Sequence, residues 1–297
     1  MCNIACNFRI TQTLILSKMI INANVGKIEI IPVQTGTVAV KQRFRDGRFK
    51  SFLSKPDFLL DRSFTEQMPI WVWVIKHPEG IFIIDTGENA KVNDNDYFDN
   101  AGFLTKWINK TQFKFEVQPK EEIGKQLKEL EITNDKIKKV ILTHLHIDHF
   151  DGLHDFEGVE IMVNKPEWEK PNFSIPSLFP KWFEPTLITT DKAITEGFNS
   201  FPLTESRDLF LIHTPGHTLG HCSVLLKGTD ICVIFAGDVV YNQEQMKHNA
   251  FAGVNQNFKV AEHTYALLTS FMKRQPTIFL PSHDQNAAKR LMHLETF

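Results

Sequence analysis

A run of metal-binding residue types follows a short apolar stretch near the middle of the chain. Residues 141–149 read Ile-Leu-Thr-His-Leu-His-Ile-Asp-His, so three imidazoles and one carboxylate lie close together. His144 and His146 are two apart on an extended segment and can point to the same side. If the chain then turns into a helix, Asp148 and His149 can face a second point nearby. Imidazole and carboxylate are ligands that suit Zn²⁺, Fe²⁺ or Mn²⁺.

The pattern His-x-His-x-Asp-His is specific, since chance produces it in about one of a thousand chains with these His and Asp frequencies. Three more candidate ligands each follow an apolar strand pattern: His217, Asp238 and His283. A sheet that ends several strands at one edge gathers such side chains. Any one of them alone is more simply read as a polar residue at a strand end. Together the seven residues predict two metals that share one carboxylate.

The elements that must position these residues follow from hydrophobic patterning. Residues 69–75 and 81–84 predict the two strands of a hairpin, joined by the turn His77-Pro78-Glu79-Gly80. Further strands are predicted over residues 28–33, 139–142, 160–163, 209–212, 223–226, 231–235 and 277–280. The spacing of apolar residues predicts helices over 122–130 and 260–273.

In two aromatic-rich segments, residues 41–68 and 166–202, the apolar residues have neither the spacing of a strand nor that of a helix. Phenylalanine is unusually common, with 25 residues against 3 tyrosines. These aromatic side chains either pin long loops onto the body of the protein or line an apolar pocket, and both can hold at once. A partly exposed aromatic surface could equally serve a homodimer.

Composition is that of a globular protein. Of 297 residues, 42% are hydrophobic and 23% are charged, with a formal net charge of −2. A dedicated nucleic-acid binder would carry a basic surplus, so no nucleic-acid partner is expected. The apolar stretch 11–21 is shorter than the span of about 20 residues that crosses a membrane, so no membrane partner is expected either. Four cysteines without CxxC spacing favour a reducing, cytoplasmic location.

The expected domain boundary lies near the N-terminus. Residues 1–26 are expected to be an extension of unknown role, and Met19 could be the true start, because a strand pattern begins soon after it. Residues 27–297 are expected to form a single domain.

From Ile28 onward the sequence closely resembles the metallo-β-lactamase superfamily, on the motif of residues 144–149 and the three strand-end ligands. The resemblance implies an α/β fold, an αβ/βα sandwich of two mixed β-sheets flanked by helices, with the metal site at one edge. It implies that one metal is bound by His144, His146 and His217. It implies that the second is bound by Asp148, His149 and His283, with Asp238 as the bridging carboxylate. Two divalent ions per chain are expected, zinc first, with iron, manganese or cobalt as alternatives.

Tyr241, three residues after Asp238, indicates one branch of the superfamily. This tyrosine and the hairpin of residues 69–87 resemble the N-acyl homoserine lactone lactonases, in which a tyrosine lies over the metals. The resemblance implies quorum quenching, in which a metal-bridging hydroxide opens the lactone ring of an acyl lactone substrate. Tyr241 would stabilise the oxyanion, and Asp148 or Tyr241 would supply a proton to the leaving oxygen. An ordinary loop tyrosine is the alternative.

Other branches of the superfamily fit the sequence less well. The true β-lactamases lack the bridging aspartate, and flavodiiron proteins have a carboxylate where this chain has His146. Thioester hydrolases of the glyoxalase II type carry a helical domain after the last ligand, and few residues follow His283. A hydrolase of a thioester, phosphotriester or other ester stays open, and the complete ligand set disfavours a non-catalytic metal-binding module. Asp85 and Asp284 could orient imidazoles or cap turns, and His221 is expected to be structural.

Overall fold

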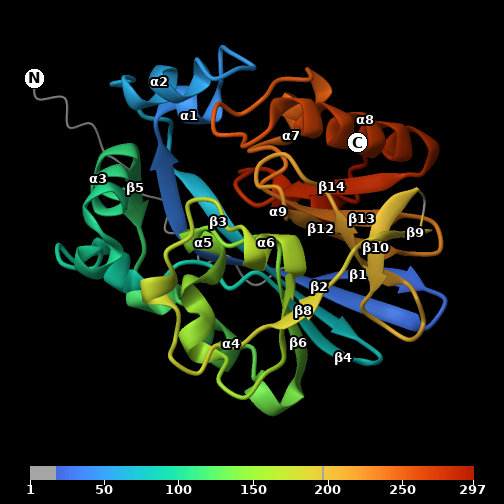
Figure 1. Ribbon diagram of the computed structural model, residues 1–297. Coiled ribbons are helices and arrows are strands. Elements are labelled where there is room, and N and C mark those ends of the chain that lie inside the picture. Colours follow the sequence, from blue (N-terminus) through green and yellow to red (C-terminus); the bar gives the residue numbers. More distant parts are fainter. Residues whose placement is uncertain (1–17, 196) are drawn as a thin grey trace, which may run out of the picture.

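The computed structural model describes residues 18–195 and 197–297. Over these residues the chain forms two mixed β-sheets with helices on their outer sides (Figure 1). The first sheet has the strand order β1-β2-β3-β4-β6-β7-β8, and β5 pairs with β2. Its strands are β1 (Met19–Ala23), β2 (Gly26–Val40), β3 (Met68–His77), β4 (Gly80–Ile84), β5 (Phe113–Glu116), β6 (Ile137–Leu142), β7 (Ile161–Asn164) and β8 (Thr186–Ile188).

The second sheet has the order β14-β13-β12-β11-β10-β9. Its strands are β9 (Lys192–Thr195), β10 (Phe198–Pro202), β11 (Leu209–His213), β12 (Cys222–Lys227), β13 (Cys232–Gly237) and β14 (Thr277–Pro281). Strands β13 and β14 run parallel. Their carboxyl ends, which precede Asp238 and His283, therefore lie at the same edge of the sheet.

The alternation of side chains along β3 shows how the layers pack. Trp71 and Trp73 face the second sheet, where the ring of Trp73 lies 5.5 Å from that of Phe235 between centroids. Val72 and Val74 point the other way, into the core beneath α4. Helix α8 covers the outer face of the second sheet. None of the described helices is long and apolar enough to cross a membrane.

Apart from α8, the α-helices between the strands are short. They are α1 (Gln42–Arg45), α2 (Ser54–Leu59), α3 (Phe103–Gln112), α4 (Ile123–Glu129), α5 (Ile147–Phe150), α6 (Lys165–Glu169), α7 (Gln243–Lys247), α8 (Phe258–Arg274) and α9 (Ala287–His293). Helices α1, α2 and α3 lie at the end of the molecule where β2 and β5 meet (Figure 1).

Each strand and helix that the patterning predicts is present, and the largest difference in length is that of β2, which continues to Val40. Strand β1 is an addition, because it pairs with β2 from Met19 opposite Ile30 to Ala23 opposite Gly26. Residues 19–26, expected to lie outside the domain, are therefore part of the first sheet. The rest of the expected extension, residues 1–17, lies outside the described residues.

The aromatic residues of the two segments both pin loops onto the core and line a cavity. In the second segment Trp168, Phe179 and Phe183 pack against the core of the first sheet and pin a long loop. In the first segment Phe44 and Phe58 form a small buried cluster with centroids 5.2 Å apart, and both also line a cavity. Aromatic side chains therefore serve packing and the cavity at once.

A buried hydrogen bond joins the β3–β4 hairpin to the second sheet. His77 Nε2 lies 3.1 Å from Asp208 Oδ2. Asp208 Oδ1 also accepts hydrogen bonds from the hydroxyls of Thr204 and Ser206, each at 2.8 Å. Burial opposes ionisation of the Asp208 carboxyl, but these hydrogen bonds lower its pKa to about 2.

The Asp208→Asn variant is expected to lose about 1–2 kcal/mol of unfolding free energy at pH 7. The folded pKa lies below the value of about 3.9 in an unfolded chain, so the carboxylate stabilises the fold fully above that value. The contribution is lost as the pH falls from about 5 toward 2. Urea unfolding of both proteins at several pH values tests this, and a gap that stays constant with pH would contradict it.

Candidate metal centre and cavity

The residues that follow β6 are positioned by buried hydrogen bonds to Asp85. This residue has a φ of +60° and follows β4. Its Oδ1 accepts from the backbone N–H of Thr143 at 2.8 Å, and its Oδ2 accepts from His149 Nδ1 at 2.8 Å. Helix α5 begins at Ile147, so the turn into a helix that the sequence predicts is confirmed.

Glu167 links the two loops that carry His146 and His217. This buried carboxylate of α6 accepts from the backbone N–H of Leu145 at 3.0 Å and from the hydroxyl of Thr218 at 2.6 Å. The sequence analysis did not single out Glu167, because no local pattern marks a contact between residues 51 positions apart.

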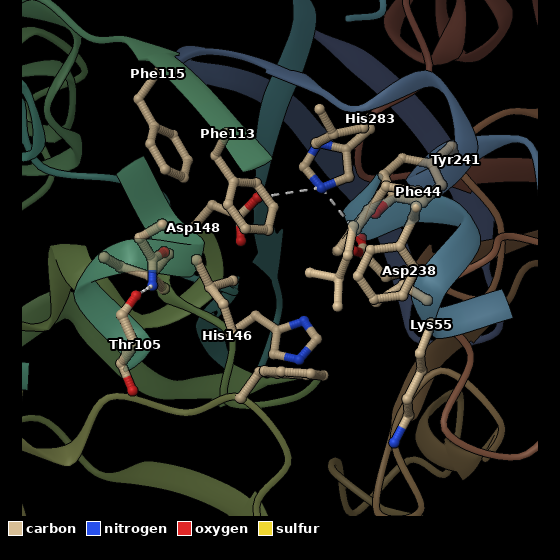
Figure 2. Close-up of a pocket in the computed structure, with 18 of the residues that line it drawn as sticks. Phe44, Lys55, Thr105, Phe113, Phe115, His146, Asp148, Asp238, Tyr241 and His283 are labelled. Carbon is tan, nitrogen blue, oxygen red and sulfur yellow. Dashed lines mark hydrogen bonds and ion pairs between the residues drawn. The ribbon is translucent and has the colours of Figure 1, made fainter. Parts of the chain in front are cut away.

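The seven predicted ligand residues come together where the ends of the two sheets meet. Potential ligand atoms of His144, His146, His217 and Asp238 lie within 4.8 Å of one another, and so do those of Asp148, His149 and His283. Asp238 lies between the groups, with Oδ1 3.3 Å from His149 Nε2 and Oδ2 3.5 Å from His217 Nε2. His283 Nε2 is 3.3 Å from Asp148 and 3.4 Å from Asp238 (Figure 2). The grouping matches the one that the family resemblance implies.

Each of four imidazoles is held at its outer nitrogen. His144 Nδ1 lies 3.1 Å from the Thr143 hydroxyl, and His149 Nδ1 donates to Asp85. His146 Nε2 donates to the carbonyl of Asn172 at 2.9 Å, and His283 Nδ1 donates to the carbonyl of Pro69 at 3.0 Å. These bonds direct the other ring nitrogen of each histidine toward Asp238 and the centre of the cluster.

The inner atoms of the cluster are buried and lack hydrogen-bond partners. His144 Nε2, His149 Nε2 and Asp238 Oδ1 have none among the described residues. Leaving such a group unsatisfied costs about 1–3 kcal/mol. His146 Nδ1, by contrast, is an acceptor because Nε2 donates to Asn172, and it accepts from His217 Nε2 at 3.0 Å. Imidazole and carboxylate donors that converge in this way fit two divalent cations.

The electrostatics of the cluster favour the cation-binding forms of His144, His217 and Asp238, but not that of His149. Burial, with nearby imidazoles, lowers the pKa of His144 and His217 well below the ordinary value. Burial opposes ionisation of Asp238, but His283 and His149 lower the pKa of its carboxyl well below its usual range. Burial also opposes protonation of His149, yet Asp238 and Asp85 raise its pKa well above the ordinary value.

His221 holds Asp238 and is structural, as the sequence predicts. Its Nε2 accepts from the backbone N–H of Asp238 at 3.0 Å, and its Nδ1 donates to the carbonyl of Thr214 at 3.1 Å. Burial lowers the pKa of His221 to about 3, so the ring is neutral. Gly237 makes this contact possible, because a Cβ there would lie 2.6 Å from His221 Nε2.

The His221→Phe variant is expected to bind divalent metal about 10–100-fold more weakly, because the ring keeps its volume but the Asp238 N–H loses its acceptor. Competition with a chelating indicator measures the affinity. His248→Ala is the matched control, since His248 is exposed and faces only Glu244. Equal affinities for wild type and His221→Phe would show that the bond to Asp238 has no effect on the site.

The sequence leaves open whether Asp85 and Asp284 orient imidazoles or cap turns, and the two residues differ in this. Asp85 orients His149, as described above. Among the residues that the structure describes, no imidazole contacts the Asp284 side chain: Oδ1 accepts from the N–H of Asn286 at 2.8 Å, and Oδ2 pairs with Arg290 at 2.7 Å. Asp284 therefore stabilises the turn before α9.

An apolar cavity of about 200 Å³ opens from the cluster (Figure 2). Its floor includes His146, Asp148, Asp238 and His283, and its walls come from β2, α1, α2, α3, β5 and Val254. The aromatic wall residues are Phe44, Phe58, Phe113, Phe115 and Phe173.

Tyr241 lies between this cavity and the cluster. Its ring stacks on His283 with centroids 5.4 Å apart and planes inclined by 27°. Its backbone N–H donates to Gln245 Oε1 at 2.8 Å, which fixes the start of α7 against it. Burial and the Asp238 carboxylate raise the pKa of Tyr241 well above the ordinary value, so the hydroxyl stays protonated near neutral pH.

Comparison with known proteins identifies the family. The family model described as the metallo-beta-lactamase superfamily matches residues 65–289. An N-acyl homoserine lactonase of a Bacillus species is 27% identical over 220 residues, which cover 73% of this chain and 82% of that protein. An acyl-coenzyme A thioesterase of Homo sapiens is 22% identical over 248 residues, which cover 75% of this chain and 76% of that protein.

Among solved structures, an N-acyl homoserine lactone hydrolase with the product N-hexanoyl-L-homoserine bound at its catalytic metal centre is similar in fold. The TM-score is 0.70 at 17% identity, over 92% of this chain and 96% of that one. The two mixed sheets with flanking helices that the sequence predicts are confirmed by this match.

Proposed function

The chain belongs to the metallo-β-lactamase superfamily, and on that premise we propose that it uses two divalent metal ions to open the lactone ring of N-acyl homoserine lactones. The observation that carries the proposal is the convergence of buried, unpartnered imidazole and carboxylate atoms at the floor of an apolar cavity. The similarity to a Bacillus N-acyl homoserine lactonase supports the choice of substrate.

We assign the ligands as the two groups of the cluster. His144, His146 and His217 would hold one ion, Asp148, His149 and His283 would hold the other, and Asp238 would be shared by both. Zinc is the proposed ion because the donors are imidazole and carboxylate, and iron, manganese or cobalt would fit the same set.

Such a pair of ions, when bound, supplies hydroxide from water at neutral pH and polarises a carbonyl oxygen. The protein residues bind the acyl chain, donate a hydrogen bond and transfer a proton. The apolar wall takes the acyl chain, at about 0.8 kcal/mol for each CH₂ buried. The protonated Tyr241 hydroxyl donates to the carbonyl oxygen as negative charge develops there. As the oxygen from water bonds to the carbonyl carbon, the carbon–oxygen bond of the ring breaks, and Asp148 or Tyr241 passes the proton that water gave up to the leaving oxygen. The product is an N-acyl homoserine, whose new carboxyl group releases one proton to solution.

The proposal is tested by proton release from N-acyl homoserine lactones with short to long acyl chains. Metal content is measured on the same sample, and a phosphotriester is run alongside. We expect rapid ring opening that a chelator abolishes, with about two metals per chain. Two metals without opening of any lactone would contradict the substrate and leave the metal centre in place.

A thioester is the second candidate substrate, favoured by the similarity to the human acyl-coenzyme A thioesterase. The apolar cavity suits the acyl chain of either substrate. The two are separated by kcat/KM for an N-acyl homoserine lactone and an acyl-coenzyme A of equal chain length. We expect the lactone to be the better substrate, and a preference for the thioester would replace the first proposal with the second.

A further inference from the structure

Helix α3 exposes apolar side chains and buries polar ones. Phe103 is 86% exposed and Leu104 is 64% exposed, whereas Asn109 and Gln112 are buried. A surface helix of a globular protein normally has the opposite arrangement. The exposed apolar face of α3 therefore indicates a contact with something beyond the described residues.

The segment around α2 continues this apolar surface on the other side of the cavity. Phe52 is 82% exposed and Leu60 is 80% exposed. We name the exposed residues Phe52, Leu60, Phe103, Leu104, Trp107 and Phe173 the mouth surface. It reaches the cavity, because Leu104 and Phe173 line the cavity itself and Phe52 lines a groove that shares Phe173 with it. Figure 2 places Lys55 of α2 and Thr105 of α3 on opposite sides of the cavity.

The charge of these segments is positive. Residues 48–62 carry four basic and two acidic residues, and residues 103–114 carry three lysines and no acidic residue, in a chain with a formal net charge of −2. Lys106 and Arg48 pair with neighbouring carboxylates, but Lys55 and Lys110 have no ion-pair partner among the described residues. Lysines interleaved with exposed Phe, Leu and Trp are typical of segments that lie in a membrane interface.

We propose that the mouth surface docks on an anionic lipid bilayer, with the cavity opening toward the membrane. The apolar side chains enter the boundary between headgroups and acyl chains, and the lysines face anionic headgroups. A second copy of the chain seated here would cover the cavity, whereas a bilayer can deliver a long acyl chain into it. Docking therefore departs from the expectation of no membrane partner. Docking on the bilayer does not depend on the proposed function. The uptake of substrate from the bilayer does rest on the proposed function.

Co-flotation of the full chain with vesicles tests the proposal. One set of vesicles is pure phosphatidylcholine, and the other contains about 30 mol% phosphatidylglycerol. We expect the protein to float with the anionic vesicles and far less with the neutral ones. Raising the salt from roughly 0.1 to 0.5 M should weaken binding, because surface charges are screened. No binding to anionic vesicles at low salt would overturn the proposal.

Variants test whether the residues of the mouth surface make the contact with the vesicle. Phe103→Ser combined with Trp107→Ser is expected to weaken vesicle binding at least about 100-fold, because two aromatic side chains would no longer be buried in the bilayer. Lys110→Glu is expected to weaken it about tenfold or more. Leu187→Ser combined with Ile194→Ser is the control, because these apolar residues of β8 and β9 are each 41% exposed, close to Trp107 at 42%. The control should bind as wild type, and an equal loss in both double variants would overturn the proposal.

Two further readouts separate the alternatives. Sedimentation velocity that finds a dimer in wild type and a monomer in the Phe103→Ser/Trp107→Ser variant would assign the surface to a second copy and overturn the proposal. Turnover of a water-soluble, short-chain lactone should be the same in all of these variants. Vesicle binding without lactone turnover in wild type would contradict the proposed function and leave docking supported.

Discussion

Replacing Asp238 with asparagine is expected to lower kcat/KM by more than about 100-fold and to leave fewer than two metals bound per chain. Asp238 lies between the two groups of the cluster, with Oδ1 near His149 and His283 and Oδ2 near His217. Asparagine keeps the size of the side chain but removes the charge and one acceptor. Loss of an outer partner of a metal ligand already costs about 10–100-fold, so loss of a shared ligand costs more.

The measurement pairs metal content with kcat/KM on the same preparation. Asp208→Asn is the matched control, because Asp208 is also a buried aspartate but lies at the β3–β4 hairpin, away from the cluster. It should keep both metals and wild-type turnover while losing stability. A fully active Asp238→Asn protein with two metals would refute the assignment of Asp238 as the bridge.

Replacing Tyr241 with phenylalanine is expected to lower kcat by about 10²-fold with little change in KM. Its ring position against His283 is kept, so packing survives and only the hydroxyl donor is lost. Removing one donor to a developing oxyanion costs about 10²–10³-fold in kcat in enzymes where it has been isolated. The effect belongs in kcat, because the donor acts most strongly on the transition state.

Tyr265→Phe provides the control for Tyr241→Phe. Tyr265 is a buried tyrosine whose hydroxyl donates to the carbonyl of Val239 at 2.9 Å, so its loss affects stability and not turnover. Metal content should be unchanged in both variants. If Tyr241→Phe opens every lactone as fast as wild type, the hydroxyl has no part in the reaction and the residue is a packing tyrosine.

The sequence predicts most of the fold because most of its elements have a buried face. Strands such as β3 and β13 alternate or run apolar over their whole length, and α8 carries an apolar stripe against the second sheet. Helix α3 escapes prediction for the opposite reason. Its apolar residues Phe103, Leu104 and Trp107 are exposed and its buried residues are Asn109 and Gln112, so the usual pattern is absent.

The candidate ligands are visible in the sequence because four of them are nearly contiguous and the rest follow strands. The residues that hold them are not, since their contacts span the chain. His221 reaches the N–H of Asp238 across 17 positions, and Glu167 reaches Thr218 across 51. Asp85 could be read two ways until its bond to His149, 64 positions away, decided between them. Long-range hydrogen bonds of this kind leave no local pattern.

The origin of the seven clustered residues has a consequence for folding. Four of them follow β6 of the first sheet, and three follow β11, β13 and β14 of the second. Divalent ions bound between them therefore crosslink the two layers, and their binding free energy adds to the free energy of unfolding. The melting temperature should rise with the concentration of free metal, so the cell's metal supply would govern how long the folded chain survives.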